Sequence, residues 1–213
     1  MSTLARYKTN YTVIIYHLCT MGYTRTGLMV IALTVEGITL ALAFLLSWYF
    51  DIPLLPLSGN VLRDVLTGTA GAVPPFVLLI FCLSKYAAGI PVLGSLRKTM
   101  LSDVKAVFAN TRFADLVIIS ILAGLAEELL FRGVLQIRFG IIIASAVFGL
   151  AHFITPSYAF IALIMGFYIG GFFYFSGSLL AVVYLHFIYD LAALTYLEYF
   201  TRDLCANHKR PEV

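Results

Sequence analysis

Residues 116–139, "LVIISILAGLAEELLFRGVLQIRF", form an apolar run long enough to cross a lipid bilayer, which takes about 20 residues. Three charged side chains, Glu127, Glu128 and Arg132, interrupt this run near its middle. A charge at the centre of a membrane helix costs at least about 2.5 kcal/mol. We therefore expect these three side chains to have a structural or chemical role inside a membrane protein.

The composition of the whole chain also indicates a membrane protein. Of its 213 residues, 61% are hydrophobic and 12% are charged, and the mean hydropathy is +0.95. A soluble domain carries about 25% charged residues. Continuous apolar runs of this length predict helices rather than the alternating strands of a membrane barrel. We predict an all-α fold, a polytopic membrane helical bundle in which residues 1–213 form a single integral membrane domain.

Six segments are long and apolar enough to give about six transmembrane helices. They lie near residues 27–50, 69–90, 113–138, 140–156, 157–176 and 178–200. The fourth is short, so it either crosses obliquely or joins the fifth through the turn at Pro156. Residues 51–68, rich in Pro and Gly, predict an outer loop. Residues 95–112 carry charged and apolar side chains at helical spacing and predict an amphipathic surface helix; a solvated connecting loop is the alternative.

The basic residues cluster in three regions of the chain. They precede the first predicted span, lie between the second and third, or follow the last: Arg6, Lys8, Arg25, Lys85, Arg97, Lys98, Lys105, Arg112, Arg202, Lys209 and Arg210. With six spans these regions lie on one side, which the positive-inside rule assigns to the cytoplasm. We predict a multi-pass cell-membrane protein with both termini in the cytoplasm. Its expected partner is the lipid bilayer, and we expect no nucleic-acid partner.

The two glutamates of "AEELLFRG" differ in what surrounds them on a helix. Residues four apart share a helix face, so Glu128 lies one turn before Arg132, in the favourable order for an ion pair. Glu127 points about 100° away and has no such partner. A polar cluster that only holds helices together is the alternative for all three side chains. That alternative explains Glu128 and Arg132 better than it explains Glu127.

Two histidines extend the set of polar residues in apolar segments. "FGLAHF" places Phe148 and His152 on one face of the fourth segment, and "HFIYD" places His186 and Asp190 on one face of the sixth. A lone histidine in an apolar helix is more often a hydrogen-bonded core residue than a catalyst. Because ionisable groups in a membrane face the bundle interior or a wet cavity, we expect those on the three segments to share one cavity.

Such a cavity supports hydrolysis of an amide bond. A free carboxylate beside a neutral imidazole takes a proton from water and generates a nucleophile, which suits Glu127 and His152. His186, one turn from Asp190, is suited to donate to the oxyanion. No serine or cysteine is placed persuasively as a nucleophile beside either histidine. Glu36, in the middle of the first span, has no evident partner and is left outside the expected site.

The motifs "EELLFRG", "FGLAH" and "HFIYD", in this order and inside apolar segments, resemble the three-motif signature EExxxR, FxxxH and HxxxN or HxxxD of the CPBP family. This family comprises CAAX prenyl endopeptidases of the Ras-converting type and Abi-like bacterial relatives, some linked to bacteriocin processing or immunity. The resemblance covers a motif-bearing core at about residues 113–192. It implies an intramembrane protease whose substrate is a peptide or protein with a membrane-proximal cleavage site.

The resemblance also implies roles for the individual residues. Glu127 and His152 activate the water, Glu128 and Arg132 hold the helix, and His186 and the residue at 190 serve the oxyanion. Many members carry asparagine where this chain has Asp190. An ionised aspartate cannot donate to an oxyanion, so we expect Asp190 to orient His186.

The expected reaction requires no cofactor. The alternative is a zinc ion held by Glu127, His152, His186 and Asp190, which offer the N and O ligands that zinc accepts. Four protein ligands, however, close the position that a catalytic zinc keeps open.

Two other functions fit the same residues. One is a proteolytically inactive membrane-binding or immunity protein, and the other is a proton-coupled transporter that uses the polar groups as a relay. The sequence favours the protease and leaves the identity of its substrate open.

Overall fold

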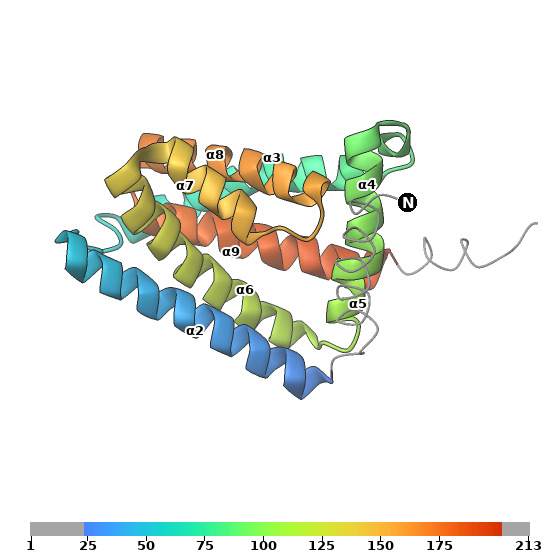
Figure 1. The fold of residues 1–213 in the computed structure, drawn as a ribbon, viewed down its shortest axis with the longest axis horizontal. Helices are drawn as coiled ribbons and strands as arrows, with labels where there is room; N and C mark the ends of the chain where they lie inside the picture. The colour runs from blue at the N-terminus through green and yellow to red at the C-terminus, as the bar shows by residue number, and fades with distance from the viewer. Residues whose placement is uncertain (1–23, 202–213) are drawn as a thin grey trace, which may run out of the picture.

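The computed structural model describes residues 24–201 of the chain (Figure 1). Within them the chain is helical, and no strand occurs between residues 24 and 201. The long helices are α2 (Arg25–Phe50), α3 (Val61–Leu83), α6 (Phe113–Glu128), α7 (Ile137–Ala151), α8 (Pro156–Ser176) and α9 (Leu179–Thr195). The shorter ones are η1 (Ala87–Gly89), α4 (Pro91–Thr99), η2 (Met100–Val104), α5 (Lys105–Phe108), η3 (Leu129–Gln136) and η4 (Tyr196–Phe200). The predicted all-α fold is therefore confirmed.

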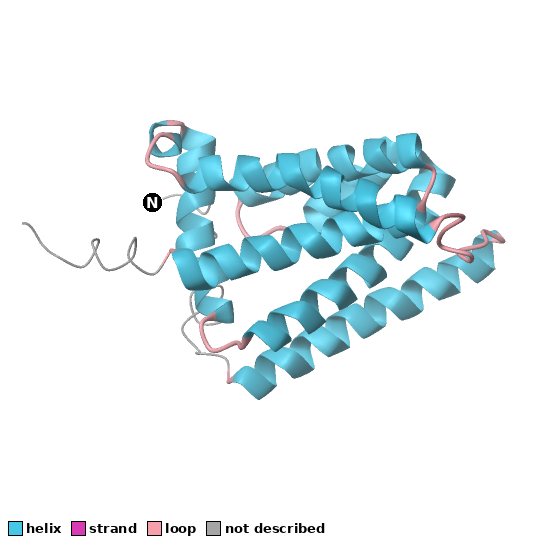
Figure 2. Cartoon of the chain, turned by 180° about the vertical axis from the view of Figure 1, so that it is seen from behind, coloured by secondary structure: helices cyan, strands magenta, loops and turns pink. Residues whose placement is uncertain are grey.

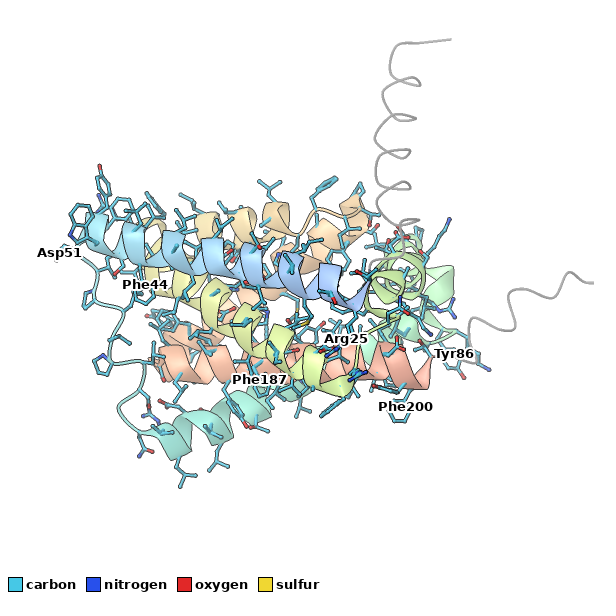
Figure 3. The ribbon with its side chains drawn as sticks, turned by 90° about the horizontal axis from the view of Figure 1, so that it is seen from below. Arg25, Phe44, Asp51, Tyr86, Phe187 and Phe200 are labelled. Carbon is cyan, nitrogen blue, oxygen red and sulfur yellow. The ribbon has the colours of Figure 1, made fainter. Side chains whose placement is uncertain are left out.

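Five helical stretches are long and apolar enough to cross a membrane: Arg25–Phe50, Val61–Leu83, Phe113–Ala151, Pro156–Ser176 and Leu179–Phe200. Large apolar side chains such as Trp48, Tyr174 and Phe175 point outward from them (Figure 3). A soluble protein would not expose so much apolar surface. The chain is a multi-pass membrane protein. Its predicted cytoplasmic termini lie outside the described residues.

The third and fourth predicted spans form one continuous stretch that bends at Gly140. This residue has φ 84° and ψ 166°, a backbone conformation that favours glycine. Beyond it, α7 folds back along the stretch formed by α6 and η3, as Figure 1 shows. The bend lets residues 141–151 return into the bundle, so the two predicted segments differ in direction although their helices are continuous.

The second span is displaced from its predicted position. We expected a loop at 51–68 and a helix at 69–90, whereas α3 covers Val61–Leu83. The cause is the cap at Asn60, whose side chain accepts a hydrogen bond from the backbone N–H of Arg63 and starts the helix early. The loop is accordingly confined to residues 51–60.

Helix α9 lies in the middle of the bundle, packed against α3 and α6 (Figures 1 and 2). Helix α2 packs on α6 and η3, and α7 packs on α8. Figure 3 shows that α2 runs the length of the bundle, from Arg25 at the end that holds Tyr86 and Phe200 to Asp51 at the opposite end. Helix α9 therefore places its side chains between the other elements that carry the sequence motifs.

The predicted surface helix at 95–112 is present in altered form, as α4, η2 and α5 over residues 91–108. These elements lie across one end of the bundle (Figure 1). Leu96, Met100 and Val104 are buried against α3 and α9, while basic residues such as Lys98 occupy the same stretch. One apolar face of this amphipathic stretch thereby closes that end of the bundle interior.

Candidate active site

The C-terminal end of α6 carries a buried ion pair. Glu128 is 0% exposed and Arg132 1% exposed, and the Arg132 Nη1 atom lies 2.9 Å from the Glu128 Oε1 atom. Arg132 also donates to the Gly166 carbonyl oxygen at 3.3 Å and lies 4.6 Å from the centre of the Phe148 ring. The pair predicted from i,i+4 spacing is thus formed, and it links η3 to α7 and α8.

Glu127 faces the end of α7. Its Oε2 atom lies 3.6 Å from the Nε2 atom of His152, and this Oε2 atom has no hydrogen-bond partner among the described residues. The Glu127 side chain is 15% exposed and that of His152 is 28% exposed. The distance is too long for a direct hydrogen bond. The two groups are therefore close neighbours that share access to water without binding each other tightly.

The tautomer of His152 follows from its other contact. The Nδ1 atom lies 2.9 Å from the carbonyl oxygen of Phe148, which only accepts hydrogen bonds, so Nδ1 carries a proton. In a neutral ring the Nε2 atom then bears the lone pair, and this atom is the one that faces Glu127. The Phe148 ring, 4.3 Å from the imidazole centre to centre, fixes the ring plane.

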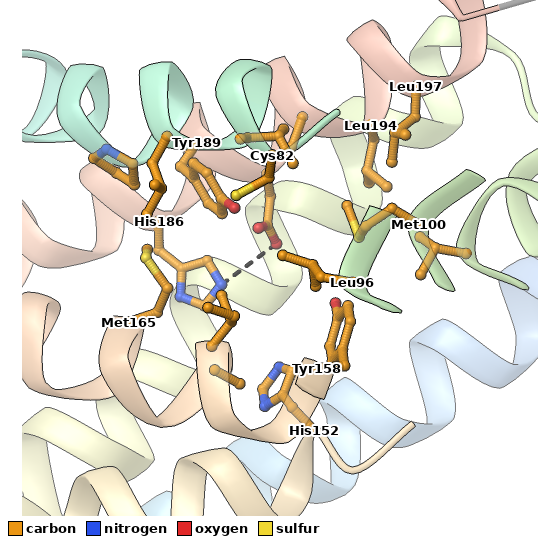
Figure 4. A pocket seen from close by; sticks show the side chains of 18 of the residues that line it. Cys82, Leu96, Met100, His152, Tyr158, Met165, His186, Tyr189, Leu194 and Leu197 are labelled. Atoms are coloured by element: carbon orange, nitrogen blue, oxygen red, sulfur yellow. Dashed lines mark ion pairs between the residues drawn. The ribbon is translucent and has the colours of Figure 1, made fainter. Parts of the chain in front are cut away.

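His186 lies between two carboxylates. Its Nδ1 atom is 2.6 Å from the Glu128 Oε1 atom, and its Nε2 atom is 3.3 Å from the Asp190 Oδ2 atom (Figure 4). Two carboxylates on opposite ring nitrogens favour a doubly protonated imidazole, with an N–H on each side. The contact with Glu128 is buried, whereas the Asp190 side chain is 28% exposed. The Nε2 N–H is therefore the one that a substrate could reach.

A close helix contact makes the Glu128–His186 pair possible. A Cβ atom on Gly124 would lie 2.9 Å from the carbonyl oxygen of Val183 and 3.0 Å from the backbone nitrogen of Phe187. No larger residue fits there, so α6 and α9 approach closely one turn before Glu128. The structure thus brings all six candidate residues into one chain of contacts, from Glu127–His152 through Phe148 and Arg132 to Glu128, His186 and Asp190.

A cavity of about 220 Å³ opens from this cluster. His152, His186 and Asp190 line it together with mostly apolar side chains. In Figure 4, His186 lies on one side of the cavity and Leu194, Leu197 and Met100 on the opposite side, with Tyr158 and Tyr189 between them. An extended apolar group fits this lining with its polar end at the histidines.

The sequence analysis left Glu36 outside the site, and the structure places it at the site. Among the charged groups that act on its carboxylate, Glu127 is the strongest, followed by His186, Asp190 and His152. Its Oε2 atom is buried and has no hydrogen-bond partner among the described residues. A mid-span acid on an otherwise apolar helix was the available signal, but the sequence does not show which face of that helix packs inward.

The four donors considered for zinc do not fit a metal site in this arrangement. Among residues 24–201, no group of three or more His, Cys, Asp and Glu side chains is placed to hold a metal ion. Both ring nitrogens of His186 already face carboxylate oxygens. A zinc ligand needs a free ring nitrogen, so the sequence-based zinc alternative would require His186 to give up one of these contacts.

Residues 109–192 match the family model of type II CAAX prenyl endopeptidase, Rce1-like. This segment is Rce1-like. It contains the three motifs that suggested the resemblance, and the match supports a CAAX-type intramembrane protease. The chain is also 31% identical over 109 residues to YpbD of Bacillus subtilis (strain 168), an uncharacterized protein; the alignment covers 49% of this chain and 58% of that protein. No solved structure matches the chain.

Proposed function

We propose that this protein is an intramembrane endopeptidase that hydrolyses a peptide bond of a membrane-associated substrate. The observation that carries the proposal is the placement of Glu127 3.6 Å from the Nε2 atom of His152, whose Nδ1 atom is fixed by the Phe148 carbonyl. A water molecule at this position meets a carboxylate and an imidazole lone pair at once. That is the combination needed to make water a nucleophile.

In the proposed reaction, one O–H of this water gives its proton to the Glu127 carboxylate and the other donates to the His152 Nε2 atom. The water oxygen attacks the scissile carbonyl carbon, and the carbonyl π electrons move to the oxygen. The Nε2 N–H of His186 donates to the resulting oxyanion. Glu127 then returns its proton to the amide nitrogen as the C–N bond breaks, which releases an acid and an amine.

The remaining residues of the site prepare His186 for this role. Glu128 holds the Nδ1 side at 2.6 Å, and Asp190 at 3.3 Å is the weaker contact that an oxyanion would replace. Asp190 therefore orients the ring and supports its second proton. Arg132 keeps Glu128 ionised and fixed in the bundle.

The substrate class follows from the cavity and the membrane setting. Apolar side chains line most of the cavity, so the residue or lipid group next to the cleaved bond is expected to be apolar. A prenylated CAAX protein and an apolar membrane-proximal peptide both satisfy this requirement. We place the end of the bundle that carries Arg97, Lys98 and Lys105 in the cytoplasm, because basic residues favour that side.

The test uses the purified full chain in phosphatidylcholine vesicles, with a farnesylated CAAX peptide, the same peptide without lipid, and an unmodified single-span peptide. Mass spectrometry identifies the products. We expect one cleavage site in at least one of these, lost in Glu127→Gln and His152→Ala while both variants unfold like the wild type. No cleavage of any of the three, or cleavage that both variants retain, would overturn the proposal.

We further propose that the reaction requires no metal. Activity should persist after exhaustive chelation and should not rise when zinc is returned. A strict zinc requirement would contradict this part of the proposal and would leave the peptidase assignment in place.

A further inference from the structure

Glu36 lies on the face of α2 that packs into the bundle. Ala43 is fully buried, and Leu40 and Phe50 pack against the same core. Positions 36, 40, 43 and 50 recur at helical spacing, so Glu36 belongs to this inward stripe. The lipid-facing side of α2 carries exposed apolar residues such as Val35 and Ile38. Of the 26 residues of α2, only Arg25, at its first position, and Glu36 are charged.

Two carboxylate oxygens near each other have no hydrogen-bond partner among the described residues. They are the Oε2 atoms of Glu36 and Glu127, which come from different helices, and both are buried. Glu127 is the charged group that acts most strongly on Glu36. Two buried carboxylates at short range do not both ionise without a large cost, so such a pair retains one proton.

The groups around the pair favour the negative charge on Glu127. Arg132 acts electrostatically on Glu127, and the His152 Nε2 atom lies 3.6 Å from it. The groups that act on Glu36 from α6, α7 and α9 are Glu127, His152, His186 and Asp190, of which two are acids. Arg25, on α2 itself, lies three turns away and is engaged by Asp115.

We propose that Glu36 is a positioning residue of the active site, which holds the proton that the Glu36–Glu127 pair retains and so leaves Glu127 ionised as the base. This inference rests on the proposed peptidase reaction for its kinetic consequence but not for the pairing itself. It adds a residue from outside the Rce1-like segment 109–192 to the reaction centre. The catalytic residues that meet the water remain Glu127 and His152.

The kinetic test is the pH profile of kcat/KM for peptide cleavage by the full chain in vesicles. Glutamine at position 36 imitates the protonated acid, so Glu36→Gln should keep its activity at neutral pH. Because the neighbouring negative charge is gone, the acid limb should move to lower pH by about one unit, as for coupled acids. Glu36→Asp should restore the wild-type limb.

Thr39→Val is the matched control. It removes a polar group from the same helix less than one turn away, but the Thr39 hydroxyl is already bonded to the Val35 carbonyl oxygen at 3.0 Å. This variant should leave both the activity and the acid limb unchanged. A Glu36→Gln profile that overlays the wild type would overturn the pairing, and loss of activity at neutral pH would show that Glu36 acts in another way.

An infrared titration separates failure of the pairing from failure of the peptidase proposal, because it needs no substrate. The purified chain should show a protonated carboxylic acid band near neutral pH that disappears in Glu36→Gln and shifts its titration in Glu127→Gln. A band that persists unchanged in Glu36→Gln would overturn the pairing even if the chain cleaves peptides. The band and its loss would support the pairing even if it cleaves none.

Discussion

Two buried acidic sites lie in this bundle, and they differ in how their oxygens are used. At one end, Asp64 is fully buried and both of its carboxylate oxygens are bonded. Its Oδ2 atom accepts from the hydroxyls of Ser58 and Ser178 at 2.6 Å each, and its Oδ1 atom accepts from the Arg63 guanidinium at 2.9–3.0 Å. This site ties the 51–60 loop and α3 to the start of α9.

In the middle of the bundle, the Oε2 atoms of Glu36, Glu127 and Glu128 have no hydrogen-bond partners among the described residues. A buried acceptor without a partner costs free energy. The Asp64 site shows that this chain can satisfy a buried acid completely. The unsatisfied oxygens therefore mark the place where the bundle gives up stability for chemistry, and the following variants probe the difference.

Glu127→Gln should have the largest effect of the variants at these sites. Removal of a general base lowers the rate by about a thousandfold, within the usual range for such groups. Stability should stay the same or rise, because the variant removes a poorly compensated buried acid. Peptide cleavage in vesicles and unfolding by increasing SDS measure the two effects. A variant that keeps its activity would break the comparison.

Glu128→Gln should act on stability as well as on activity. It leaves the Arg132 charge buried without a charged partner, and breaking such a pair costs about 3–5 kcal/mol. His186 also loses the ionised partner of its Nδ1 atom. The free energy of unfolding in mixed micelles is the measurement. A variant as stable as the wild type would contradict the structural role given to Glu128.

Asp64→Asn should lower stability and leave catalysis alone. The amide cannot accept all four hydrogen bonds, so we expect a loss of about 1–3 kcal/mol in the free energy of unfolding. The values of kcat and KM should match those of the wild type when measured well below the unfolding transition. A changed kcat in folded protein would show that the two sites are coupled.

Asp190→Asn should have the smallest effect. Asparagine still offers an acceptor to His186, so the expected loss is one ordinary hydrogen bond, or about tenfold in kcat/KM. The CPBP motif itself allows either residue at this position. A loss as large as that of Glu127→Gln would show that Asp190 takes part in proton transfer.

The sequence predicted the parts of the site that depend on local spacing. The i,i+4 rule predicted the Glu128–Arg132 pair, and the capping and periodicity of the apolar runs predicted most helices. The displaced start of α3 was missed because Arg63 and Asp64 look like loop residues, whereas their side chains serve the Asp64 site.

The position of Glu36 could not be predicted for a different reason. Helix α2 is apolar on every side, since one face meets lipid and the other meets the bundle. Periodicity therefore does not reveal which face packs inward. The contact between Glu128 and His186 likewise depends on the close approach of α6 and α9 at Gly124, which is a tertiary feature.

The most direct test of the central claim is a double-mutant cycle on Glu127 and His152. If both residues act on a single water molecule, the effects of Glu127→Gln and His152→Ala are not additive, because either change alone disables that water. We predict that kcat/KM of the double variant equals that of the weaker single variant. Losses that multiply would show that the two residues act independently and would contradict the account.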